Sequence, residues 1–145
     1  MAMVRVAVVY FSKSKSSRVN ATATALAKAL EARGAQVDLV NGSQTRDAKL
    51  TGHHFLAIGC DVLAAFGGKL PPELKVFLAN SGLIAGKRAL AWVTSAPLGA
   101  NKTLLQLMRA MEAEGLLLRT SEIFTKADEA SRVASQLKID GLTVS

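Results

Sequence analysis

A hydroxyl-rich turn follows the first apolar run of the chain, and its residue types suit an anion. The run covers residues 6–11, and Ser12 comes directly after it. The side chains that follow are Lys13, Ser14, Lys15, Ser16, Ser17 and Arg18. Seryl oxygens, cations and the free N–H groups of a helix start would together bind a dianionic group. The pattern predicts a phosphate-binding turn. A plainer reading stays open, in which a serine only caps the helix and the cations are solvated.

Five apolar runs of strand length alternate with amphipathic stretches of helix length. The runs cover residues 4–11, 36–40, 54–60, 88–95 and 116–124. This alternation is typical of βαβ units and a mostly parallel sheet, with central strands covered on both faces. We therefore expect an α/β fold, a single three-layer doubly wound domain that spans residues 1–145.

Four helices are expected between and after these strands. Three of them show apolar stripes: Val19, Ala23, Leu26, Ala27 and Leu30; Leu104, Leu107, Met108 and Met111; and Ala130, Val133, Ala134 and Leu137 in a helix over residues 128–139. The fourth is indicated by Pro72, which suits the first turn of a helix over the residues that follow it, 73–78. Gly34 and Gly115 are placed to end two of them in left-handed caps. Residues 41–52 are polar without a firm period, which predicts a loop or a short helix.

Composition bounds the function classes. The chain has 145 residues, is 50% hydrophobic and carries 18 Lys and Arg against 11 Asp and Glu, a formal net charge of +7. This charge favours acidic partners, but the basic residues are scattered and aromatic content is only 5%, so we do not expect nucleic-acid binding. One cysteine excludes an internal disulfide, and we expect no metal site, no membrane span and a cytoplasmic location.

Three loop motifs resemble those of the flavodoxin family. The segment YFSKSKSS (residues 10–17) resembles the family's Y-F-S-x-T-G-N-T phosphate loop. The segments GCDV (59–62) and TSAPLGA (94–100) stand where the family has its second and third flavin loops. The resemblance implies a five-stranded parallel sheet of order 2-1-3-4-5, with helices on both faces and FMN at the carboxyl ends of strands one and three. It also implies one-electron transfer to a redox partner protein.

The resemblance implies a set of FMN-binding residues. They are Ser12, Lys13, Ser14, Lys15, Ser16 and Ser17 in the first loop; Cys60, Asp61, Val62, Leu63, Phe66 and Gly67 in the second; and Thr94, Ser95, Ala96, Pro97 and Gly99 in the third. Two features depart from the family pattern: Lys15 replaces a glycine, and Phe66 is the only aromatic residue of the second and third loops.

These departures keep three functions open. The first is an FMN-binding electron carrier of flavodoxin type, whose basic surface would select a redox partner with an acidic face. The second is a flavodoxin-like module that has lost FMN and binds another phosphorylated ligand or an acidic protein. The third, a flavin-dependent reductase, would need a substrate pocket over the ring, so we expect a carrier rather than a stand-alone enzyme, as a monomer or weak dimer.

Several residues that could do chemistry have plainer readings. Cys60 ends a buried strand without an adjacent cation, which indicates inert packing. His53 and His54 precede the third strand at the opposite end of the sheet, where we expect a surface role. Trp92 lies within the fourth strand and is expected in the core.

Overall fold

The computed structural model describes residues 3–12, 18–45, 47–62 and 69–142. Its strands are β1 (Arg5–Phe11), β2 (Gln36–Asn41), β3 (Phe55–Cys60), β4 (Arg88–Thr94) and β5 (Leu117–Phe124). Its helices are α1 (Arg18–Ala32), α2 (Pro72–Ala79), α3 (Ala100–Ala113) and α4 (Ala127–Gln136). Every strand and helix expected from the sequence is therefore confirmed.

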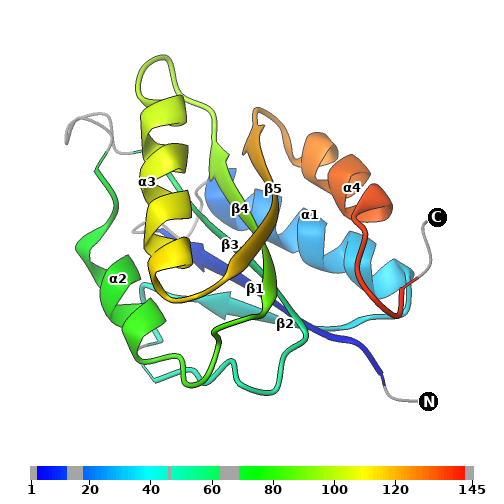
Figure 1. The fold of residues 1–145 in the computed structure, drawn as a ribbon. Helices are drawn as coiled ribbons and strands as arrows, with labels where there is room; N and C mark the ends of the chain where they lie inside the picture. Colours follow the sequence, from blue (N-terminus) through cyan, green and yellow to red (C-terminus); the bar gives the residue numbers. More distant parts are fainter. Residues whose placement is uncertain (1–2, 13–17, 46, 63–68, 143–145) are drawn as a thin grey trace.

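The five strands form one parallel sheet of order β2-β1-β3-β4-β5, as predicted. Helices α1 and α4 cover one face, and α2 and α3 cover the other, which gives three layers (Figure 1). Strand order reverses between β1 and β3, where Phe11 lies opposite Cys60. The loops that leave these two strands in opposite directions open a crevice at the carboxyl edge, the place where ligands bind in such sheets.

The central strands explain why the sheet is stable. From their second residue onward β1 and β4 are buried, and β3 is buried throughout, because helices cover both of their faces. Trp92 is fully buried, as predicted, and its ring lies over Gly59 on the neighbouring strand. A Cβ added at Gly59 would come within 2.1 Å of that ring, so only glycine fits there.

Two helix ends follow the sequence signals and one does not. Gly34 and Gly115 both have positive φ, 100° and 86°, and end α1 and α3 as predicted. The last helix was expected to reach residue 139, but α4 ends at Gln136 because Leu137 turns into an extended conformation. Leu137 stays buried, so its place in the apolar pattern was right although its secondary structure was not.

The segment between β2 and β3 is a loop in its described residues. Asn41 starts a turn, because its side-chain oxygen accepts a hydrogen bond from the Ser43 N–H and its carbonyl accepts from the N–H groups of Gln44 and Thr45. No helix forms in residues 41–45 or 47–52. Of the two expectations for this segment, the loop is confirmed.

His53 corrects the expectation of a surface role. Only 5% of this residue is exposed, and its Nε2 lies 2.7 Å from a carboxylate oxygen of Asp38 in β2. Arg5 contacts the same oxygen at 3.5 Å. The cluster joins the amino-terminal ends of β1, β2 and β3, whereas His54 is exposed as expected.

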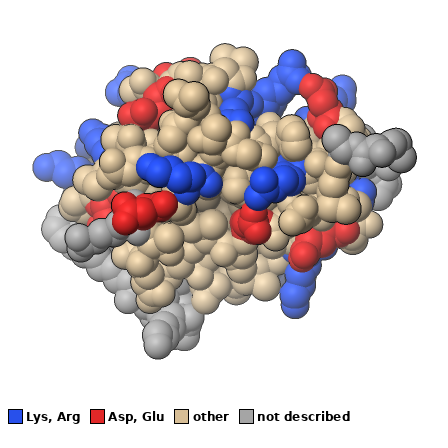
Figure 2. All heavy atoms as spheres, turned by 90° about the horizontal axis from the view of Figure 1, so that it is seen from below, with Lys and Arg blue, Asp and Glu red and all other residues tan. Residues whose placement is uncertain are grey.

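Charge is spread over the face of the molecule seen from below in Figure 2. On the face seen in Figure 2, Lys and Arg side chains alternate with Asp and Glu and form no continuous basic patch. This view agrees with the scattered charge noted in the sequence. Within the described ranges, no helix is both long and apolar enough to cross a lipid bilayer.

Candidate functional site

The carboxyl edge of the sheet brings the described parts of the three predicted loops together. Ser12 follows β1, Asp61 follows β3, and Thr94 ends β4, on three strands that are neighbours in the sheet. Helix α1 also begins at this edge, with Arg18 as its first residue. The topology therefore assembles one site from segments about 80 residues apart in the chain.

Ser12 is held by the protein itself. It is only 8% exposed, and its backbone N–H donates a hydrogen bond of 3.1 Å to the Ser43 hydroxyl in the loop after β2. This N–H is therefore not directed at a ligand. The rest of the predicted phosphate turn lies outside the described residues and stays a prediction: Lys13, Ser14, Lys15, Ser16 and Ser17.

Asp61 and Thr94 form a hydrogen-bonded pair that joins the ends of β3 and β4, next to the reversal of strand order. The Thr94 hydroxyl donates to a carboxylate oxygen of Asp61 at 3.0 Å. Thr94 is only 2% exposed, whereas Asp61 is partly buried. Burial raises the pKa of Asp61, and the bond from Thr94 and the positive charge of Arg18 limit the rise. The pair thus places an oriented acceptor at the mouth of the site.

Arg18 connects the start of α1 to two other loops. Its guanidinium donates to the Ser95 carbonyl at 2.9 Å, to the Ser95 hydroxyl at 3.4 Å and to the Thr125 carbonyl at 3.4 Å. By its position in the sequence, Arg18 belongs with the cations of the predicted phosphate turn, but nothing in the sequence predicts these contacts. The side chain fixes the loop after β4 against α1, and its charge stays at the site.

Cys60 behaves as packing. It is completely buried, and its pKa is raised to about 12 by burial first, with smaller contributions from the negative charges of Asp61 and Glu73. The thiol is therefore neutral and unreactive at ordinary pH. Val62 is half-buried and packs against the core cluster that contains Cys60, on the side of the sheet covered by α2 and α3. The other second-loop predictions, Leu63, Phe66 and Gly67, lie outside the described residues.

The third loop after β4 offers backbone and small side chains. Ala96 is half-buried, Pro97 is exposed, and Gly99 has a φ of 91° at the start of α3. Leu98 is 78% exposed and is the largest apolar side chain of this loop. A planar ligand at this edge would meet Leu98 and no aromatic ring from residues 94–99.

Comparison with solved structures decides the fold class. The chain is similar to a flavodoxin from the domain Archaea, with 17% identity and a TM-score of 0.70 over 89% of this chain and 93% of that one. A Streptococcus pneumoniae TIGR4 flavodoxin gives 14% identity and 0.72 over 90% and 95%. Two-electron reduced Megasphaera elsdenii flavodoxin gives 18% and 0.66 over 89% and 97%.

This chain has the flavodoxin-like fold. At these identities the likeness establishes the architecture alone. No family model matches the sequence. No curated protein matches it either.

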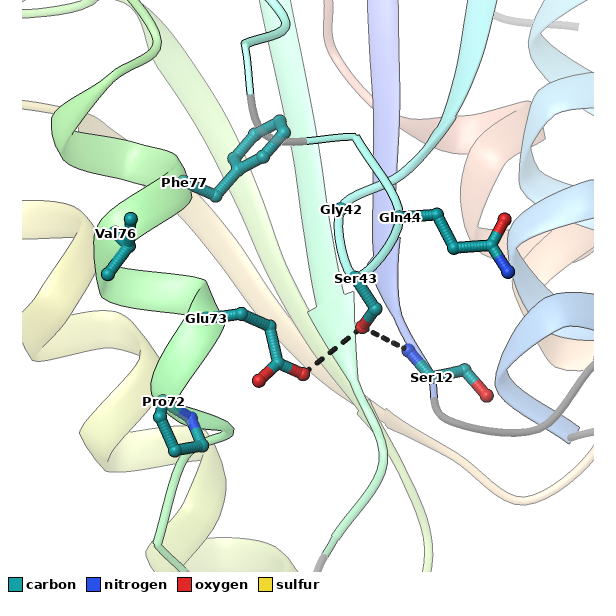
Figure 3. A pocket seen from close by; sticks show the side chains of 8 residues that line it. All are labelled: Ser12, Gly42, Ser43, Gln44, Pro72, Glu73, Val76 and Phe77. Carbon is teal, nitrogen blue, oxygen red and sulfur yellow. Dashed lines mark hydrogen bonds between the residues drawn. The ribbon is translucent and has the colours of Figure 1, made fainter.

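The flavodoxin-like domain also contains site residues that sequence reasoning missed. A cleft of about 660 Å³ lies beside Ser12, between the loop after β2 and helix α2 (Figure 3). Ser43 and Glu73 face each other across it, with the Ser43 hydroxyl 3.2 Å from a carboxylate oxygen of Glu73. Nothing in the sequence pairs these two residues, because they lie 30 positions apart on elements of different type.

Among the described residues, no group of three or more His, Cys, Asp and Glu side chains could hold a metal ion.

Proposed function

We propose that this domain binds FMN and transfers electrons, as flavodoxins do. The observation that carries the proposal is the assembly of Asp61, Thr94 and Arg18 with the end of β1 at the reversal of strand order. In open α/β sheets this crevice is where nucleotide ligands bind. The flavodoxin structures named above support FMN in particular.

The residues present fit a phosphorylated ligand. Helix α1 begins at this edge and has no acidic residue in its first turn, so none of its own first-turn side chains neutralises the positive end of the helix. Arg18 adds a cation at the same end. We propose that the turn of residues 12–17 holds the phosphate, while Asp61, Thr94 and Ser95 meet the polar edge of the ring. FMN, when bound, supplies the one-electron redox chemistry.

Absorption and fluorescence test this proposal directly. We expect the purified protein to be yellow, or the apoprotein to quench FMN fluorescence with a Kd of about 1 μM or lower. Riboflavin, which lacks the phosphate, should bind at least about tenfold more weakly because it loses the charge-assisted hydrogen bonds. A colourless protein that leaves FMN fluorescence unchanged would contradict the proposal.

A pair of variants locates the binding site. Arg18→Gln removes a cation at the start of α1 and should weaken FMN binding about 3-fold to 10-fold. Lys28→Gln, on the exposed surface of the same helix but ten residues away, should leave the affinity unchanged. Equal effects of the two substitutions would mean that only net charge matters, which would exclude a site at the start of α1.

A second candidate function is a module that has lost FMN and binds another phosphorylated ligand or an acidic protein. The observation in its favour is that Ser12 donates its N–H to Ser43, while residues 94–99 present no aromatic face to a ring. The two functions separate in one titration. Inorganic phosphate binding without FMN binding would support the second candidate.

For the electron carrier we also propose the cellular setting. The charge of +7 would favour a redox partner protein with an acidic face. We propose that the carrier is cytoplasmic, that it is a monomer or weak dimer, and that residues 1–145 form one domain. Light scattering coupled to size exclusion tests the oligomeric state, and a stable dimer at micromolar concentration would contradict it.

A further inference from the structure

The cleft between the β2 loop and α2 has two different walls. Its described lining residues are Ser12, Gly42, Ser43, Gln44, Pro72, Glu73, Val76 and Phe77. The loop wall is polar, and the helix wall is largely apolar apart from Glu73 (Figure 3). A volume of about 660 Å³ is in the range of small-molecule sites. Of these lining residues, only Ser12 also belongs to the proposed phosphate turn.

Glu73 is oriented by a chain of hydrogen bonds. The Ser12 N–H donates to the Ser43 hydroxyl at 3.1 Å, and that hydroxyl donates to Oε1 of Glu73 at 3.2 Å. Asn41 holds the Ser43 N–H at 3.0 Å. A carboxylate at the first turn of α2 is favourable by itself, but the helix end does not explain why it faces Ser43. A carboxylate offers about four acceptor sites, and this single bond leaves most of them free for a ligand.

The apolar wall is packed against the core through Phe77, which is only 2% exposed. Phe77 packs edge-on against Phe11, with ring centroids 5.4 Å apart and an interplanar angle of 86°. Val76 is 56% exposed, so it presents its side chain without being needed in the core. Gly42 allows the loop wall to approach, because a Cβ there would lie 2.3 Å from the Phe11 ring. The cleft is therefore shaped before any ligand arrives.

Charge selects the ligand. Glu73 is the one ionisable side chain among the described lining residues, in a protein whose net charge is +7. An anion would meet an unneutralised carboxylate, whereas a cation would gain a charge-assisted hydrogen bond. The negative charge of Glu73 is also among the causes that raise the pKa of Cys60 behind the cleft.

We propose that this cleft binds a small organic cation, an ammonium or amidinium group on an apolar body. The cationic group donates to Glu73, and the apolar body lies on the exposed Val76, beside the buried Phe77. The site differs from the proposed FMN site in the sign of its charge and in its residues, with only Ser12 shared.

Benzamidine and benzoate provide a probe with a matched control of opposite charge. Both have a flat apolar ring, but benzamidine is a cation and benzoate an anion at neutral pH. In a ¹H–¹⁵N NMR titration we expect benzamidine to bind with a Kd of about 1 mM and to shift the amides of residues 42–44 and 73–77. Benzoate should not shift them. The proposal would be overturned if benzamidine and benzoate bound equally well, or if only the amides of other segments shifted. It would also be overturned if benzamidine did not bind at about 20 mM, 20-fold above the expected Kd.

Variants separate the carboxylate from the rest of the cleft. Glu73→Gln keeps an oxygen that accepts from Ser43 but removes the charge, and should weaken benzamidine binding about tenfold or more. Glu112→Gln, an exposed residue of α3 outside the cleft, should change nothing. Affinity that survives Glu73→Gln would refute the role of the charge.

A second variant covers the case in which Glu73→Gln does not fold. Val76 is exposed and lies three residues after Glu73 on α2. Val76→Lys therefore places the ammonium group of the new lysine beside the Glu73 carboxylate without disturbing the core. Benzamidine affinity should again fall about tenfold, while thermal unfolding stays within about 2 °C of the wild type. An unchanged affinity in this folded variant would contradict the proposal. FMN binding in either variant should match the wild type, so the two proposals fail independently.

Discussion

Gly59 should be the least replaceable residue of β3. A Cβ added there would lie 2.1 Å from Cδ2 and Cε2 of Trp92 and 2.6 Å from Cε3, against an ordinary contact distance of about 3.5–4 Å. The Trp92 ring is fully buried and also contacts Phe124, with ring centroids 6.1 Å apart. It therefore has no open space to move into. We expect Gly59→Ala to cost about 2–3 kcal/mol, the upper part of the range for overpacked cores.

The measurement is urea or thermal unfolding. At this chain length a loss of that size lowers the melting temperature by about 4–12 °C. Trp92 is the only tryptophan, so its fluorescence reports on this site in the single variant. Gly52→Ala is the matched control, because a Cβ there would contact only the flexible end of the Arg5 side chain. It should stay within about 0.5 kcal/mol of the wild type.

A double-mutant cycle tests the cause. Trp92→Leu costs about 3 kcal/mol by itself because it leaves a cavity, but it also removes the ring that collides with the new methyl group. The loss of unfolding free energy in the double variant, measured by circular dichroism, should therefore be about 1–2 kcal/mol smaller than the sum of the two single losses. If the losses simply add, or if Gly59→Ala costs less than about 0.5 kcal/mol, the collision is not what restricts residue 59.

Three further changes test the electrostatics and the buried groups. Burial raises the folded-state pKa of Asp61, so its ionisation opposes folding as the pH rises through that pKa. Asp61→Asn should therefore stabilise the protein at pH 7, by less than about 1 kcal/mol because the carboxylate is partly exposed to water. The gain, measured by urea unfolding, should vanish near pH 3, where the carboxylate is protonated. The Cys60 thiol, with a pKa of about 12, should resist Ellman's reagent at pH 8 in the folded protein and react fully in urea; prompt labelling without urea would show that the strand end opens. Asp38→Asn removes the charged partner of the buried His53 and should lower the free energy of unfolding by about 1–2 kcal/mol. Asp140→Asn, in the exposed pair with Arg88, should lower it by less than about 0.5 kcal/mol. Similar losses in the two variants would mean that the burial of His53 does not matter.

The fold could be predicted from the sequence because its signals are local. Residues 6–11 are apolar on successive positions, which is the mark of a strand covered on both faces, and α1 carries its apolar stripe at a helical period. The end of α4 could not be predicted, because Leu137 leaves the helix without a glycine or proline to mark the place. His53 was misplaced for a related reason, since its partner Asp38 lies on β2, far in the sequence from the segment before β3 that carries His53.

The candidate site was predictable only in part. Topology places the ends of β1, β3 and β4 together, so the loops that carry Asp61 and Thr94 could be named from the sequence. The contacts of Arg18 could not, because a hydrogen bond from a side chain to a backbone carbonyl 77 or 107 residues away leaves no period or motif. The bond between Ser43 and Glu73 escaped for the same reason.

The two proposals rest on opposite charges at one edge of the sheet. The face covered by α1 and α4 offers a helix start without acidic residues and the guanidinium of Arg18, which favour an anion. The face covered by α2 and α3 offers Glu73 in a cleft whose described lining contains no cation, which favours a cation. The two sites therefore differ in the sign of their local charge, although they lie on either side of β1. The net charge of +7 does not by itself predict which ligand either site prefers. Raising the salt concentration should weaken phosphate and benzamidine binding alike, whereas Glu73→Gln should weaken only the second, so local geometry and overall charge can be distinguished in one set of titrations.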